Sequence, residues 1–157
     1  MSDILYHRIQ PEDTALLSLL SEWYNTEWNM DKITTIQRFI DFPETGIPFH
    51  LAMTLDGKPI AAGGLANHVS ILTHVPRLKI YQPWLSLVYT TPENQKKGYG
   101  TMLCHKIEAL AKELGIKEYF LFTYTAEKLY IKLGWEVMER LLVNDKNMVV
   151  MKKIIAS

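Results

Sequence analysis

The spacing of apolar and polar residues changes several times along the chain, and each change predicts a boundary between structural elements. A β-prone run at 4–9 is followed by leucines and a tryptophan at helical spacing, with Pro11 in the expected first turn. Asp31 can cap a second helix, in which isoleucines recur on one face until Pro43 ends it. These isoleucines are Ile33, Ile36 and Ile40. The N-terminal part is therefore predicted to be a strand followed by two helices.

Beyond this region the spacing becomes that of strands. The runs 49–55 and 59–66 are apolar and flank the turn sequence 56–58, which predicts a β-hairpin. The segment 68–81 has mixed polarity, so it is predicted to be a long connection, a kind that is uncommon unless it has a function. The apolar, β-prone run 84–90 predicts a further strand.

The clearest element is a helix over 101–114. Its apolar residues fall at i, i+4, i+7 and i+11 from Leu103, its opposite face is charged, and Gly115 suits the position just after a helix. The remainder predicts a strand over 119–123, then a short helix that Thr125 caps. A final strand pair is predicted at 135–143 and 148–154. The predicted order is β, α, α, β, β, β, α, β, α, β, β.

Composition narrows the class of protein. The chain has 157 residues, with 17 basic against 17 acidic residues and one cysteine. This length predicts one domain over 1–157 that folds without disulfides, in a reducing, cytoplasmic setting. A net charge of zero disfavours nucleic acid as a partner, and the apolar runs are too short to span a membrane. With one cysteine and no histidines at ligand spacing, no metal site is expected.

A glycine-containing turn precedes the clearest helix and carries the candidate chemistry. It reads Gln95-Lys96-Lys97-Gly98-Tyr99-Gly100. The two glycines allow a tight turn and a close approach of a ligand to the backbone, while the first helical turn offers unpaired N–H groups. Lys96 and Lys97 add positive charge at the same place, so the turn predicts a site for a pyrophosphate.

Two other phosphate-binding motifs do not fit the residues of this turn. A dinucleotide fingerprint would need Gly or Ala where Leu103 stands, and a P-loop would need Gly-Lys-Ser/Thr, which 98–102 does not supply. A plain surface helix, with a glycine turn and two solvated lysines, fits the six residues taken alone about as well.

Three further segments favour the ligand site. Together with the turn, the segments 83–93, 117–123 and 126–136 resemble the GCN5-related N-acetyltransferase family, and 126–136 is similar to its Ala-x-x-Leu-Tyr-x-Lys-Leu-Gly-Phe signature. The resemblance implies an α/β (α+β) fold with a mixed, mostly antiparallel sheet of six to seven strands and helices on both faces. It also implies acetyl-CoA as the donor and an amine as the acceptor, and dimers are common in such families.

The resemblance further implies roles for particular residues. The backbone of Val88, Tyr89 and Thr90 would pair with the pantetheine arm of acetyl-CoA. The pyrophosphate would be held by Gln95, Lys96, Lys97, Gly98, Tyr99, Gly100 and Thr101. Thr123 stands where the family usually has an asparagine, and its hydroxyl is expected to reach the cofactor.

Tyr130 matches the family tyrosine that lies near the sulfur of CoA. A phenol with a pKa of about 10 can donate a proton to a departing thiolate whose thiol has a pKa of about 8.5. From helix pattern alone, Tyr130 would be an ordinary aromatic on a short amphipathic helix. The run 84–90 has no carboxylate to serve as a base, which leaves ordered water, Glu93, His68 or Glu27 to remove the proton of the amine.

The acceptor amine is not identified by the sequence. Trp28 lies between the two predicted N-terminal helices, where it can line an acceptor pocket while Glu27 or Asp31 attracts a cation. A small-molecule or peptide amine is expected. The alternative function is a non-catalytic module that senses acyl-CoA or mediates protein association.

Overall fold

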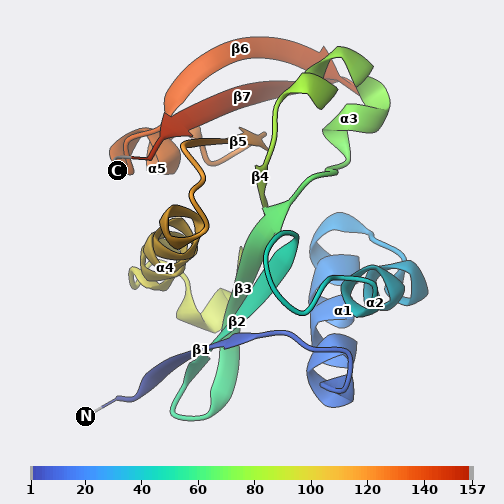
Figure 1. Cartoon of the computed structure of the whole chain (residues 1–157), viewed down its shortest axis with the longest axis vertical. Coiled ribbons are helices and arrows are strands. Elements are labelled where there is room, and N and C mark those ends of the chain that lie inside the picture. The colour runs from blue at the N-terminus through green and yellow to red at the C-terminus, as the bar shows by residue number, and fades with distance from the viewer. Residues whose placement is uncertain (1, 156–157) are drawn as a thin grey trace. The chain divides into compact units, whose positions relative to one another are not determined.

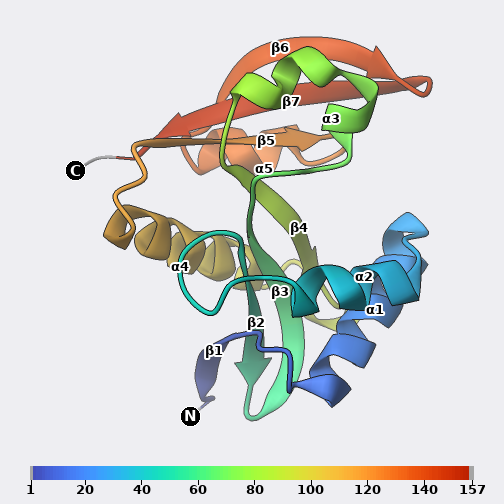
Figure 2. The same ribbon diagram turned by 45° about the vertical axis from the view of Figure 1, so that its right-hand side comes forward.

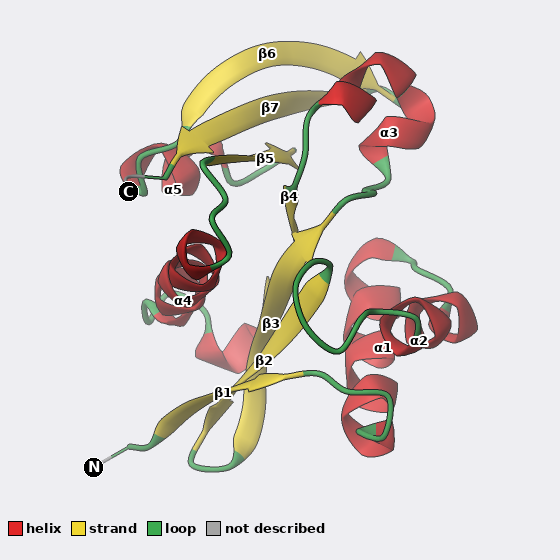
Figure 3. Cartoon of the chain, in the orientation of Figure 1, coloured by secondary structure: helices red, strands yellow, loops and turns green. Residues whose placement is uncertain are grey.

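A computed structural model of the chain describes residues 2–155, and its elements are shown in Figures 1 and 3. The described strands form a seven-stranded mixed sheet in the order β1-β2-β3-β4-β5-β7-β6. The strands are β1 (Ile4–Arg8), β2 (Phe49–Leu55), β3 (Lys58–Ala66), β4 (Trp84–Thr90), β5 (Glu118–Thr123), β6 (Glu136–Val143) and β7 (Lys146–Ile154). The helices are α1 (Thr14–Trp28), α2 (Lys32–Ile40), α3 (Ile71–His74), α4 (Tyr99–Glu113) and α5 (Glu127–Lys132), with 3₁₀ turns η1 (Pro76–Ile80) and η2 (Pro92–Asn94). This confirms the expected mixed α/β fold class.

The residues group into two compact units. One runs up to Leu65 and includes Leu87–Ile107, and the other consists of Ala66–Ser86 and the chain from Glu108 onward. Strand β4 therefore contributes its first residues to the second unit and its last residues to the first. Residues 1, 156 and 157 of the predicted domain lie outside the described part of the chain.

In the first unit, β1, β2 and β3 pair antiparallel, and the predicted hairpin is present, with Leu55 opposite Lys58. Figures 1 and 2 both show α1 and α2 side by side. Apolar side chains of α1 and α2 pack with those of the strands in one buried cluster. Its members are Ile9, Leu17, Leu20, Tyr24, Phe39, Ala52 and Ala62.

The ends of α1 and α2 follow from local hydrogen bonding. Asn29 adopts the left-handed conformation that ends α1, and the Asp31 carboxylate accepts a hydrogen bond of 2.8 Å from the Thr34 N–H, as its predicted capping role requires. Pro11 lies in a turn before the helix and not in its first turn, because α1 begins only at Thr14.

The apolar stripe predicted for α2 is not its buried face. Ile33 is 80% exposed, whereas Thr35 and Phe39 are the buried residues of α2. Phe39 packs beside Tyr24 and His50, at ring-centroid distances of 6.4 Å and 4.7 Å. Contacts from outside α2 therefore decide which side of this short helix is buried.

In the second unit, β5, β7 and β6 pair antiparallel, and the start of β4 pairs with β5 in parallel at Trp84 and Phe120. The segment 68–81 is not an irregular connection as predicted, because it forms α3 and η1. Ile71, Leu72 and Leu78 anchor it in a second buried cluster with Trp84. Figures 1 and 2 show α3 beside β6 and β7.

Candidate active site

The end of β4 is held in place before the glycine turn begins. The Thr91 N–H donates to the Ile60 carbonyl at 2.9 Å, and the Asn94 side-chain amide donates to the Thr91 hydroxyl at 2.8 Å. The Gln95 side-chain amide donates to the Thr90 carbonyl at 3.0 Å. The turn 95–98 thus starts from a fixed backbone position at the end of the strand.

The turn itself has the backbone geometry that its glycines were predicted to supply. Gly98 has a φ of +86°, and Lys96 also has a positive φ of +62°. The first residue of α4 is Tyr99, and the Met102 N–H donates to the Gly98 carbonyl at 3.1 Å. The N–H groups of Tyr99, Gly100 and Thr101 precede the repeating helical bonds, so they are available to an anion.

The surroundings of Gly100 are open enough for a ligand to approach the backbone closely. A Cβ placed on Gly100 would have one near neighbour, the Thr90 hydroxyl oxygen at 3.5 Å, which is an ordinary contact. Lys96 and Lys97 are exposed beside this position. The residues present therefore fit a phosphorylated group, held by backbone N–H donors and two cations.

In strand β4, the residue just before Val88, Leu87, has an unusual backbone conformation. Leu87 has a φ of +54°, a conformation that costs a non-glycine residue on the order of 1–3 kcal/mol and persists only where its surroundings enforce it. The Tyr24 hydroxyl donates to the Leu87 carbonyl at 2.8 Å, and the Leu87 side chain packs against the buried cluster of the first unit. Sequence reasoning missed this feature, because a leucine in a β-prone run gives no signal for a positive φ.

The Tyr24 hydroxyl also contacts a buried histidine, His50. His50 Nε2 lies 2.7 Å from the Tyr24 hydroxyl, and both residues are buried. Burial and, to a smaller extent, the nearby Arg38 cation together lower the pKa of His50 to about 3. Burial also raises the pKa of Tyr24 well above its usual range. Both side chains are therefore neutral near pH 7.

His50 makes folding stability dependent on pH. Because the unfolded histidine titrates near pH 6.5 and the folded one near pH 3, the unfolded state binds an extra proton between these values. Stability is therefore full above pH 6.5 and falls as the pH decreases. Between pH 6.5 and pH 4.5 the histidine alone should cost about 2 kcal/mol.

Urea denaturation of the wild type and of His50→Gln at the two pH values tests this. The free energy of unfolding should drop by about 2 kcal/mol more in the wild type than in the variant, since the other titratable groups are common to both. Equal drops would show that His50 is not buried in its neutral form.

An aromatic cluster surrounds Tyr89 on the same strand. Trp28 stacks on Tyr24 at 5.5 Å and meets Tyr89 edge to face at 6.2 Å, and Trp23 lies 5.3 Å from Tyr89. Trp28 remains 45% exposed. The structure thus brings the predicted acceptor residue, Trp28, next to a predicted cofactor residue, Tyr89.

Two carboxylates influence the Tyr89 hydroxyl. Burial raises the pKa of Tyr89, and the negative charges of Glu27 and Glu93 raise it further. Asp31, the other predicted cation partner, instead caps α2 through the backbone and hydroxyl of Thr34. Glu27 is therefore the better placed of the two for a cation near Trp28.

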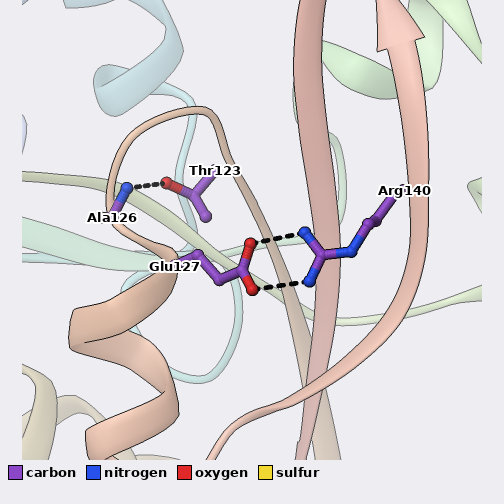
Figure 4. Close-up of polar contacts among 4 residues, drawn as sticks. All are labelled: Thr123, Ala126, Glu127 and Arg140. Carbon is purple, nitrogen blue, oxygen red and sulfur yellow. Dashed lines mark hydrogen bonds and ion pairs between the residues drawn. The ribbon is translucent and has the colours of Figure 1, made fainter.

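Tyr130 and Thr123 belong to the second unit. Tyr130 is 8% exposed, and its ring meets Trp135 edge to face at 6.0 Å. The Thr123 hydroxyl oxygen accepts a hydrogen bond of 3.0 Å from the Ala126 N–H (Figure 4), and the hydroxyl proton is still able to donate. The predicted cap by Thr125 is absent, because Ala126 is the N-cap residue of α5 and no described side chain caps this helix. In Figure 4, Arg140 of β6 forms two hydrogen bonds of 2.7 Å to Glu127, which fixes the start of α5.

The described part of the chain runs from residue 2 to residue 155. Within this range, no cluster of three or more His, Cys, Asp or Glu side chains is arranged to hold a metal ion. In the same range, no helix is both long and apolar enough to cross a membrane.

Comparison with known proteins agrees with the observed fold. The profile of the acetyltransferase (GNAT) family matches residues 14–135. No curated protein sequence gave a match.

Solved structures share the fold at low sequence identity. The aminoglycoside 6'-N-acetyltransferase from Enterococcus faecium is 15% identical, with a TM-score of 0.75 over 98% of this chain and 98% of that chain. The ribosomal-protein-S18-alanine N-acetyltransferase from Escherichia coli is 16% identical, with a TM-score of 0.68 over 100% of this chain and 96% of that chain. An aminoglycoside 6'-N-acetyltransferase complexed with coenzyme A is 15% identical, with a TM-score of 0.74 over 98% of each chain. With the family profile matching most of its length, the chain belongs to the acetyltransferase (GNAT) family.

Proposed function

We propose that the protein transfers the acetyl group of acetyl-CoA to a primary amine, with residues 1–157 acting as one domain in the cytoplasm. The observation that carries this proposal is the turn from Gln95 to Thr101, which has N–H groups without helical partners and two lysines at the start of α4, in the connection that follows β4 and η2. A related solved structure holds coenzyme A, which supports a CoA thioester as the donor.

The cofactor-binding residues are proposed in two groups. In the first unit, the backbone of Val88, Tyr89 and Thr90 binds the pantetheine arm, and the turn through Thr101 binds the pyrophosphate. In the second unit, the Thr123 hydroxyl donates to the cofactor. The fixed end of β4 supports the first assignment, because Thr91 and Gln95 both hold the backbone there.

The reaction requires no covalent intermediate with the enzyme. The neutral amine nitrogen attacks the carbonyl carbon of the thioester, a C–N bond forms, and the C–S bond breaks. A backbone N–H of β4 stabilises the negative charge on the carbonyl oxygen. The Tyr130 hydroxyl donates a proton to the departing thiolate, and water accepts the proton released by the amine.

The acceptor proposed for this site is a cationic amine. Trp28 is exposed next to Tyr89, and the charges of Glu27 and Glu93 act on the same hydroxyl. An ammonium group is attracted both to carboxylates and to an aromatic face. These features favour a polyamine, an aminoglycoside or a peptide amine over a neutral acceptor.

The KM for the acceptor amine, measured in a Trp28 variant, tests the role of Trp28. Trp28→Ala should raise the KM for the acceptor by roughly 5-fold to 30-fold, as expected for loss of a cation–π contact of about 1–2 kcal/mol, with little change in the KM for acetyl-CoA. Ile80→Ala is the matched control, because Ile80 is 80% exposed and belongs to the other unit. An unchanged acceptor KM in Trp28→Ala would remove this residue from the acceptor site.

A panel of primary amines tests the reaction itself. Release of free CoA from acetyl-CoA is followed with each amine, and the acetylated product is identified by mass spectrometry. The proposal expects amine-dependent release with at least one cationic amine. Tight binding of acetyl-CoA without turnover on any amine would instead favour the non-catalytic acyl-CoA sensor, a function compatible with the absence of a carboxylate on β4.

A further inference from the structure

The peptide group between Leu87 and Val88 is held by two side chains that have no role so far in the proposed reaction. The Leu87 carbonyl accepts from the Tyr24 hydroxyl at 2.8 Å, and the Tyr24 hydroxyl lies 2.7 Å from His50 Nε2. Both side chains are buried, and Tyr24 comes from α1 whereas His50 comes from β2. Three separate elements thus meet at one peptide of β4.

The protons of this network can be placed in only one way. A carbonyl oxygen only accepts, so the single proton of the Tyr24 hydroxyl is donated to Leu87. His50 Nε2 must then carry a proton and donate it to the Tyr24 oxygen. The hydrogen bonds therefore run in one direction, from His50 through Tyr24 to the backbone of β4.

Holding the Leu87 carbonyl also orients the next N–H group. The carbonyl of Leu87 and the N–H of Val88 belong to the same planar peptide, and in a trans peptide they point in opposite directions. The left-handed backbone of Leu87 sets this peptide at an angle that a regular strand does not have. Without the hydrogen bond from the Tyr24 hydroxyl, no side-chain donor among residues 2–155 would hold the Leu87 carbonyl at this angle.

We infer that Tyr24, oriented by His50, is a positioning residue that aims the Val88 N–H at the carbonyl oxygen of the bound thioester. The inference rests on the proposed function, because it needs acetyl-CoA along β4. Its structural support is the position of the strained residue, directly before the strand segment assigned to the cofactor. Strained backbone that its surroundings enforce is concentrated at catalytic sites.

Infrared spectroscopy of acetyl-CoA labelled with ¹³C at the thioester carbonyl provides the test. A hydrogen bond to this carbonyl lowers its stretching frequency, so the wild-type complex should show a band below that of free acetyl-CoA. Tyr24→Phe keeps the ring and removes the hydroxyl, and its band should move back toward the free value. Tyr119→Phe is the matched control, because it also removes a buried hydroxyl, which bonds Glu108, and its band should equal that of the wild type.

The affinity for CoA separates positioning from general damage. CoA has no thioester carbonyl, so its Kd should stay within about threefold in Tyr24→Phe, while kcat with a reactive amine falls roughly 10-fold to 100-fold, as for a misaligned oxyanion donor. His50→Gln keeps a side-chain N–H donor and should retain the wild-type band, whereas His50→Leu should shift it. This second pair decides the question if Tyr24→Phe does not fold.

The outcomes distinguish the two proposals. If the wild type does not bind acetyl-CoA, the proposed function fails. If acetyl-CoA binds and the band is unshifted in the wild type, or equally shifted in the wild type and in Tyr24→Phe, the positioning role is wrong while the cofactor assignment stands. Equal bands for His50→Gln and His50→Leu would remove His50 from the network.

Discussion

Gly100→Leu should weaken acetyl-CoA binding by at least about 100-fold, because each hydrogen bond from an N–H group to a charged phosphate is worth about 1.5–3 kcal/mol and the added side chain blocks at least two of them. Gly100 lies in the first turn of α4, beside the N–H groups of Tyr99 and Thr101. Isothermal titration calorimetry with acetyl-CoA measures the change directly.

The control is Gly100→Ala at the same position. A Cβ there meets only the Thr90 hydroxyl, at the ordinary distance of 3.5 Å, so alanine fits the free protein and should bind acetyl-CoA nearly as the wild type does. Both variants should fold at least as stably as the wild type, because glycine inside a helix costs roughly 0.5–1 kcal/mol relative to alanine. Retention of full affinity by Gly100→Leu would show that the turn does not hold the pyrophosphate.

Tyr130→Phe should lower kcat by roughly 10²-fold to 10⁴-fold, the usual contribution of a positioned proton donor, while the Kd for acetyl-CoA stays nearly constant. The ring stays in place against Trp135, because phenylalanine keeps the edge-to-face contact of the tyrosine. Steady-state kinetics with a reactive amine, together with calorimetry, separates turnover from binding.

Tyr81→Phe is the matched change in the same unit, since the Tyr81 ring packs on Phe120 and only its hydroxyl is lost. It should leave kcat unchanged. A Tyr130→Phe enzyme with the turnover of the wild type would exclude the hydroxyl as the donor to the thiolate and leave Tyr130 with a packing role.

The sequence predicted those parts of the fold that depend on local chemistry. The turn at 95–100 was predicted from its glycines, and Gly98 has the positive φ that this requires. The cap at Asp31 and the hairpin between β2 and β3 likewise depend on residues close together in the chain. The roles assigned to Val88, Thr123 and Tyr130 come from the family resemblance and remain predictions.

Features that depend on distant residues were not predicted. Tyr24 and His50 are 26 positions apart, and Tyr24 and Leu87 are 63 apart, so no spacing in the sequence indicates their contact. The buried face of α2 depends similarly on the fit of Phe39 between Tyr24 and His50, which helical periodicity does not encode. The segment 68–81 was assigned to a connection because its apolar residues are divided between two short helical elements, neither of which is long enough to show a helical period.

The central claim, that this chain binds acetyl-CoA, is tested most directly by a thermal melt of the wild-type protein with acetyl-CoA, with ATP and NAD as controls. At about 100 times its Kd a ligand stabilises the fold by roughly 2.7 kcal/mol, which raises the Tm of a protein of this size by about 5–11 °C. The Tm should rise by this amount with acetyl-CoA and change little with NAD or ATP. An unchanged Tm at saturating acetyl-CoA would contradict the central claim and would reduce the glycine turn to an ordinary start of a helix.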